Sequence, residues 1–160
     1  MFRLVEESAI ARYICDSFAG IVPVTAWGEA SFFYNPRRAL PRGVYFATLK
    51  NKDGDNDRAS DLDRPAVFRL NIGISKATYR QLVGPLPARP SAGSVVATGH
   101  DFSALDTLLP HPVYGLMAWV SVLNPTPATF DLTRPLLDEA YGLAVAKFCK
   151  RVSGAVGLSA

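Results

Sequence analysis

The sequence predicts a single α+β domain, in which helices pack on one face of a curved, mainly antiparallel sheet. The chain has 160 residues, of which 49% are hydrophobic and 19% charged, as is typical of one globular domain with its own core. Apolar residues recur at helical spacing near both ends of the chain. Between these ends lie short segments rich in β-branched and aromatic residues, separated by turn sequences. Together these observations predict helices against an antiparallel sheet.

The first element expected is a helix over residues 6–18, which Gly20 ends. Its core-facing side is formed by Ile10, Tyr13, Ile14 and Phe18. Three strands are expected next, over residues 21–27, 30–36 and 44–50. The turn sequences between them are typical of an antiparallel meander.

The middle of the chain begins with an acidic loop and continues with the strand 66–74. Ser75 is expected to cap a short helix over residues 76–83. The segment 85–99 is rich in Pro, Gly, Ser and Ala, which predicts a flexible surface insertion. A short helix over residues 101–109 and a strand over residues 116–124 complete this part.

A long helix is expected at the end, capped by Thr126 and with Pro127 at its first position. Pro135 lies inside the helical pattern and predicts a kink or a division into two helices. The domain should span residues 1–152, followed by a disordered tail over residues 153–160. The apolar stripe of this helix consists of Phe130, Leu136, Leu137, Ala140, Tyr141, Ala144, Val145 and Phe148.

Composition narrows the cellular context and the partners. No apolar run approaches the ~20 residues that a membrane span needs, and the N-terminus does not resemble a signal peptide. We therefore expect a cytoplasmic protein without a membrane partner. Cys15 and Cys149 are then predicted to be buried free thiols, although a disulfide is the alternative. The formal net charge of +3 permits an anionic partner without requiring one.

The sheet face away from the helices is the predicted ligand surface. Strand alternation puts Arg69 and Asn71 opposite the apolar side formed by Phe68, Leu70 and Ile72. The same alternation puts Trp119 and Ser121 opposite Ala118, Val120 and Val122. If the registers agree, these polar and aromatic groups share one face, joined by Tyr34 or Tyr45. Such a surface suits a small polar ligand, and the alternative is an ordinary solvated sheet face.

His111 stands between Pro110 and Pro112, just before the Trp119 strand. As a catalytic residue it would act as a general base, or donate a hydrogen bond to a ligand. In the alternative interpretation the prolines fix an extended turn and the imidazole bonds to the backbone. Tyr114 is either a ligand donor or a half-buried tyrosine whose hydroxyl faces water.

The acidic loop spaces Asp53, Asp55 and Asp57 like the start of a calcium loop. Arg58 replaces the required glycine and Arg64 replaces the bidentate glutamate, so the pattern disfavours calcium. Asp61 and Arg64 are instead expected to form a structured turn that lies beside the polar face as one wall of the pocket. No metal site and no cofactor is expected.

Several longer segments resemble a family of bacterial proteins that is common in actinobacteria, the domain-of-unknown-function family numbered 6194. The resemblance rests on SDLDRP, FRLNIG and PHPVYG and covers the chain from Phe32 to about Lys147. It implies no activity, and the chain departs from the family pattern between Leu86 and Gly99. The element order more distantly resembles MmcQ/YjbR proteins, which implies a CyaY-like fold and DNA binding. The positions that recur in the family numbered 6194 correspond here to Asp61, Arg64, Arg69, Asn71, His111, Pro112, Tyr114 and Trp119.

The first functional hypothesis is a small-molecule-binding domain, or a small enzyme of actinobacterial specialised metabolism. Arg69 would hold an anionic or carbonyl group, Asn71 would orient it and Trp119 would stack on it. The second hypothesis is nucleic-acid binding through Arg37, Arg38, Arg42 and the basic C-terminal end. The third is an interaction protein that forms a homodimer through the sheet face; otherwise the protein is a monomer.

Overall fold

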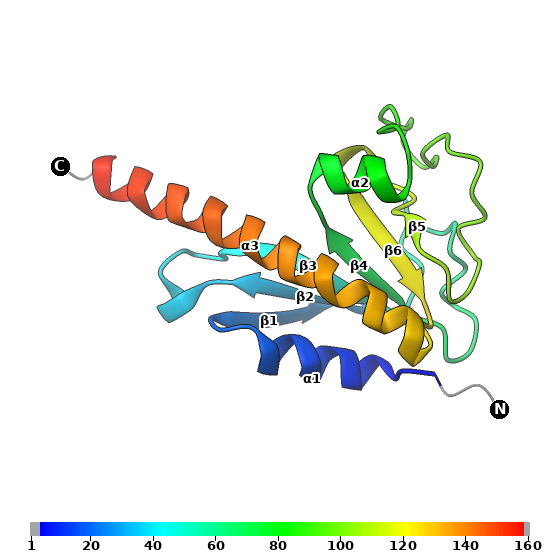
Figure 1. Ribbon diagram of the computed structural model, residues 1–160, viewed down its shortest axis with the longest axis horizontal. Helices are drawn as coiled ribbons and strands as arrows, with labels where there is room; N and C mark the ends of the chain where they lie inside the picture. The colour runs from blue at the N-terminus through cyan, green and yellow to red at the C-terminus, as the bar shows by residue number, and fades with distance from the viewer. Residues whose placement is uncertain (1–3, 159–160) are drawn as a thin grey trace.

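The computed structural model describes residues 4–158 and confirms an α+β fold (Figure 1). Six strands form one sheet in the order β1-β2-β3-β4-β6-β5, and neighbouring strands run antiparallel. The elements are α1 (Glu7–Ser17), β1 (Ile21–Ala26), β2 (Glu29–Tyr34), the 3-10 helix η1 (Pro36–Arg38), β3 (Val44–Lys50), β4 (Arg69–Gly73), α2 (Lys76–Leu82), β5 (Leu109–Pro110), the 3-10 helix η2 (Gly115–Met117), β6 (Trp119–Leu123) and α3 (Pro127–Leu158).

The main core lies between the helices and one face of the sheet. In Figure 1, α3 crosses this face diagonally and α1 lies along its lower edge. This arrangement confirms the predicted apolar sides of the helices, since Ile10 and Ile14 of α1 and Leu137 of α3 are buried in one core with Leu70 and Val120. We call this side the helix face and the opposite side the outer face.

A β-bulge in β3 decides which residues reach the outer face. Phe32 pairs with Ala47, whereas Phe33 pairs with Tyr45, so Phe46 is the additional residue. Phe46 and Ala47 both belong to the main core, although they are consecutive. The bulge therefore puts Tyr45 and Thr48 on the same outer face, and it bends the strand.

Long loops cover the outer face at β4, β6 and β5. Figure 1 shows the β3–β4 and α2–β5 segments gathered on the right of the view, beside β5 and β6. Beneath them Leu62, Val67, Leu109 and Leu123 form a second, smaller core. Because of this cover, the polar side of β4 is buried, where the sequence predicted an open surface.

The short helix predicted over residues 101–109 does not form. Asp101 accepts hydrogen bonds from the amide and hydroxyl of Ser103, which makes a turn, and Leu109–Pro110 pairs with β6. Asp106 accepts the amide of Thr126 at the start of α3. These side-chain bonds fix a local turn at Asp101 and hold Asp106 against the start of α3, so the segment follows a loop path instead of a helix.

The last helix differs from the expectation in two respects. Pro135 lies inside α3, and the helix runs unbroken from Pro127 to Leu158, so the alternative of a division into two helices is wrong. Phe130 and Leu137, on either side of the proline, are buried in the same core and hold the two parts together. The helix also continues past residue 153, where a disordered tail was predicted. Residues 159–160 of that tail lie outside the described residues.

The two cysteines are free but exposed, which corrects the prediction of buried thiols. Cys15 follows the buried Ile14, and Cys149 follows the buried Phe148. A helix turns about 100° between consecutive residues, so each thiol is rotated out of the apolar stripe. Among residues 4–158, every helix is too short or too polar to cross a membrane.

Candidate functional site

Arg69 lies at the centre of a polar network buried on the outer face, and its side chain is 0% exposed. Its Nε donates to Oδ1 of Asn71 over 2.8 Å. Its Nη1 donates to Oδ1 of Asp57 over 2.9 Å and to Oγ of Ser60 over 2.8 Å. Its Nη2 donates to the other carboxylate oxygen of Asp57. A buried guanidinium is tolerated only when it is paired and hydrogen-bonded in this way.

Asn71 connects three strands within the same network. Its Oδ1 accepts from Ser121 of β6 over 2.8 Å, and its Nδ2 donates to Thr48 of β3 over 2.9 Å. The register explains these contacts, because Asn71 stands directly opposite both Thr48 and Ser121. The prediction that Arg69, Asn71, Trp119 and Ser121 share one sheet face is confirmed.

His111 is buried beside Arg69 and is held by the backbone that follows it. Its Nδ1 accepts the amides of Val113 and Tyr114, each over 3.0 Å. The proton of the neutral ring must therefore lie on Nε2, which stands 3.3 Å from Nη2 of Arg69. Burial, with the charge of Arg69, lowers the pKa of His111 to about 3, and Asp57 offsets only part of this.

This geometry favours the turn role of His111 over the general-base role. Nδ1 is occupied by two amides, and Nε2 carries the proton, so the ring has no free lone pair to accept a proton from a substrate. A hydrogen bond from the amide of Gly115 to the carbonyl of His111 closes the same turn. His111 thus positions the 112–115 turn, while Pro110 pairs with β6.

Asp57 is the member of this network that the sequence did not single out as a site residue. Burial raises its pKa, but the hydrogen bonds and charge of Arg69 outweigh burial, and the pKa lies below its ordinary value. Mutual backbone hydrogen bonds between Gly54 and Asp57 close the local turn. Asp53 and Asp55 precede it at the same spacing, so no local signal singles out the acid that meets a β4 arginine.

Two adjoining hollows lie above this network. The Asp57 hollow, of about 280 Å³, is lined by residues 55–59, 93–95 and 112–113. The Tyr114 hollow, of about 260 Å³, is lined by Asn56, residues 89–94, Val113, Tyr114 and Leu116. The two hollows share Asn56, Gly93, Ser94 and Val113 as lining residues. Asp57 lines the first hollow and Tyr114 the second. The predicted insertion 85–99 supplies one wall of each hollow, through residues 93–95 in the first and 89–94 in the second.

Trp119 lies apart from these hollows. Its indole lies against the Tyr45 ring with 5.4 Å between centroids, and it covers Gly73 of β4. Tyr45 is therefore the tyrosine that joins the outer face, whereas Tyr34 packs against Tyr141 in the main core. Burial raises the pKa of the Tyr45 hydroxyl, and the nearby Tyr114 and Glu29 add to this.

Arg64 ties two loops together. Its guanidinium donates to the carbonyls of Asp61, Ser60 and Ser103 over 2.8, 2.9 and 3.0 Å. Asp61 is exposed, and its carboxylate lies only 3.5 Å from Arg64. Both residues thus stabilise the turn predicted from the sequence, and neither lines the Asp57 or the Tyr114 hollow.

Two further acids of the loop, Asp53 and Asp63, also accept hydrogen bonds from the backbone. Asp53 accepts the amide of Leu62 over 2.8 Å, and Asp63 accepts the amide of Asp53 over 3.0 Å. Within residues 4–158, no three His, Cys, Asp or Glu side chains come close enough to hold a metal ion. The acidic loop therefore has a structural explanation in the hydrogen bonds that close it.

Comparison with known proteins places these residues in a family. A model described as a family of unknown function, DUF6194, matches residues 5–153. The chain belongs to the DUF6194 family. No curated protein and no solved structure matches it, so the MmcQ/YjbR likeness remains a prediction. In this DUF6194 protein the matched region includes the whole network from Thr48 to Ser121 and both hollows above it.

Proposed function

We propose that this protein binds a small molecule in the Asp57 and Tyr114 hollows. The observation that supports the proposal is the Asp57 carboxylate, which lines a hollow while the buried Arg69 holds it from below. Each hollow alone is small, but together they reach the ~300–1,000 Å³ typical of ligand sites. The network thus serves as a rigid base, and its rim contacts the ligand.

The lining favours a ligand with a hydrogen-bond donor at one end and an apolar body. Asp57 is ionised because its pKa is lowered, so it accepts hydrogen bonds from an amine or a hydroxyl. Val113, Tyr114 and Leu116 offer apolar and aromatic surface to the rest of the molecule. The sequence-based proposal therefore changes in one respect: Asp57 contacts the ligand, and Arg69 and Asn71 support it from beneath.

The geometry supports binding more strongly than catalysis. His111 has no free lone pair, and four of the five N–H groups of Arg69 already donate to Asn71, Asp57 and Ser60. An enzyme of specialised metabolism would have to use Asp57 as its acid–base group. We propose that the protein is cytoplasmic, since two exposed free thiols suit a reducing compartment.

The proposal can be tested by amide NMR with two probes of opposite charge, tyramine and 4-hydroxybenzoate. Tyramine should shift the amides of Asn56, Ser94 and Val113 at millimolar concentration, and 4-hydroxybenzoate should not. Ser94 lines both hollows and is not part of the Arg69 network. Ser94→Tyr places a bulky side chain in the hollows and should abolish the shifts. Ser17→Tyr, at an exposed site in α1, is the matched control and should leave them intact. Equal shifts in Ser94→Tyr, or none in the wild type, would refute the proposal.

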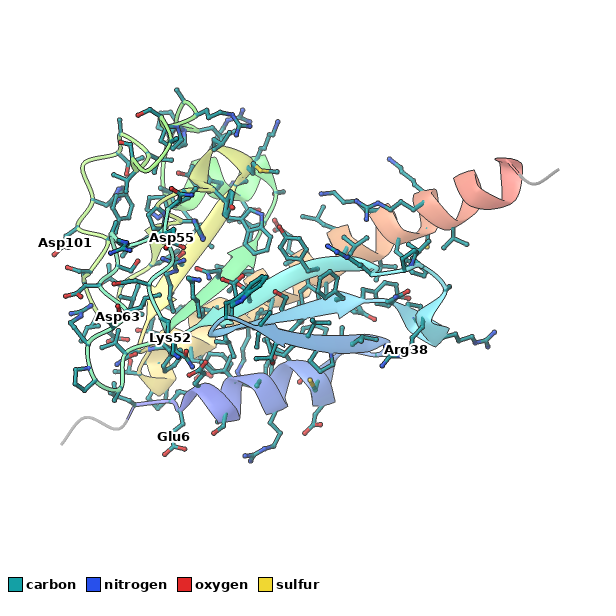
Figure 2. All side chains as sticks on the ribbon, turned by 180° about the vertical axis from the view of Figure 1, so that it is seen from behind. Glu6, Arg38, Lys52, Asp55, Asp63 and Asp101 are labelled. Carbon is teal, nitrogen blue, oxygen red and sulfur yellow. The ribbon has the colours of Figure 1, made fainter. Side chains whose placement is uncertain are left out.

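A second candidate, nucleic-acid binding, is favoured by a basic end of the molecule. Arg151 donates to the carbonyl of Gly43, next to Arg42, so the C-terminal helix and the segment between η1 and β3 bring these two arginines together. Figure 2 shows the labelled Arg38 far from Asp55 and Asp63, at the end opposite the long loops. Fluorescence anisotropy with single-stranded DNA would test this, since affinity should fall steeply from 50 to 200 mM salt. Salt-independent binding would contradict it.

A further inference from the structure

The tip of the β1–β2 hairpin carries a tryptophan in an unfavourable backbone conformation. Trp27 has φ +50° and Gly28 has φ +73°, the pair of positive angles that a tight two-residue hairpin turn requires. Asn, Asp and Gly adopt this conformation readily, whereas a bulky side chain does so at a steric cost. The side chain is also 94% exposed. Neither the fold nor the proposed ligand site explains this residue.

A large apolar pocket lies beside the hairpin. The pocket, which we call the N-terminal pocket, has a volume of about 710 Å³. Its apolar lining consists of Leu4, Val5, Leu62, Ala66, Val67 and Phe68. Lys52 lines the pocket and also borders the hairpin, since a Cβ at Gly28 would lie 3.0 Å from the Lys52 side chain. The exposed indole and the apolar pocket therefore belong to the same end of the molecule.

The rim of the pocket carries both signs of charge. Glu6, Glu7 and Asp63 are acidic, and Lys52 and Arg64 are basic. Figure 2 shows the labelled Glu6, Lys52 and Asp63 at the end where the loops gather. A two-fold axis brings the same surface of two copies together, so such a rim can pair acids of one copy with bases of the other.

We propose that the protein forms a two-fold symmetric dimer, in which Trp27 of each copy inserts into the N-terminal pocket of the other. A contact of this kind buries an exposed indole, which is the side chain most enriched among interface hot spots. It also gives the unfavourable turn a reason, because the turn directs the indole away from its own molecule. This surface is separate from the Asp57 and Tyr114 hollows, and its test is independent of theirs.

Sedimentation equilibrium over a range of concentrations tests the dimer. Trp27→Ala should weaken dimerisation at least ~30-fold, as expected for loss of a hot spot. Leu4→Arg, which places a charge at the half-exposed edge of the pocket, should weaken it similarly. Leu132→Arg is the matched control, since Leu132 is exposed on α3 outside the pocket, and it should dimerise like the wild type. A wild type that stays monomeric at high micromolar concentration would overturn the proposal.

Mixing the two variants tests whether the insertion is reciprocal. Trp27→Ala keeps an intact pocket, and Leu4→Arg keeps an intact tryptophan, so the mixed dimer regains one of the two insertions. Their mixture should associate more tightly than either variant alone, and no recovery would refute reciprocal insertion.

Tryptophan emission reports the burial of Trp27 directly, because in Trp119→Phe it is the only tryptophan. Its emission should shift to the blue as concentration rises; a blue emission independent of concentration would show that Trp27 fills its own pocket, which contradicts the dimer.

Discussion

Nε2 of His111 lies 3.3 Å from Nη2 of Arg69, and both atoms carry hydrogen. The amides of Val113 and Tyr114 fix this arrangement, because they occupy Nδ1 and leave the proton on Nε2. Protonation of His111 would place a second positive charge beside the buried guanidinium. The pair therefore makes the stability of the network dependent on pH.

Stability should fall as pH drops from about 6.5 towards 3. In this interval the unfolded His111 binds a proton, whereas the folded residue, with its pKa lowered to about 3, does not. The free energy of unfolding should thus decrease by up to ~1.4 kcal/mol per pH unit from this group. The lowered pKa of Asp57 adds a loss in the same direction at the acid end. Urea unfolding at several pH values measures this slope.

His111→Asn is the variant that isolates the effect. An asparagine oxygen can accept the same two amides but does not titrate, so the slope should flatten. His100→Asn is the control. The His100 ring is exposed, lies outside the Arg69 network and forms a hydrogen bond with the Thr98 hydroxyl. An unchanged slope in His111→Asn would contradict the assignment.

Arg69→Met should lower the free energy of unfolding by about 3–5 kcal/mol, because it leaves the Asp57 carboxylate, Ser60 and Asn71 without their partner. Chemical denaturation measures the loss. Arg58→Met removes a solvent-exposed arginine that pairs with Asp55, and it should leave stability within experimental error. Similar losses in both variants would show that burial of the Arg69 pair has no special role.

Gly73→Ala should destabilise the protein by about 1–3 kcal/mol, because the new Cβ would lie 2.8 Å from the Trp119 ring. The indole must then move away from Tyr45, which near-ultraviolet circular dichroism would detect. Gly142→Ala is the matched control: nothing lies within 4 Å of its Cβ, and it stands inside α3. There alanine should stabilise by about 0.5–1 kcal/mol. A stabilising Gly73→Ala would refute the close contact.

Arg64→Lys should loosen the 58–66 loop while retaining the charge. Lysine cannot bind the three carbonyls of Ser60, Asp61 and Ser103 in one fork. Amide hydrogen exchange in the loop should accelerate about tenfold or more, for a loss of about 1–2 kcal/mol. Arg58→Lys, in the same loop but exposed, should leave the exchange rates unchanged. Equal exchange in both variants would show that Arg64 does not join the loops.

Local patterns predicted most of the regular structure. Apolar spacing located α1, and Ser75 caps α2 through its side chain as expected. Strand alternation placed Arg69 and Asn71 on the face of Trp119 and Ser121, which the register confirms. These predictions hold because helical and strand periodicity depend on neighbouring residues alone.

The sequence by itself determined the α+β class, the polar face of β4 and β6, and the turn at His111. Only the tertiary structure decided that loops bury this face, that Asp57 meets Arg69 and that the bulge at Phe46 brings Tyr45 to it. Asp57 and Arg69 are 12 positions apart and meet through a loop without periodicity. Contacts between loops and strands depend on how the whole chain packs, so no local pattern encodes them.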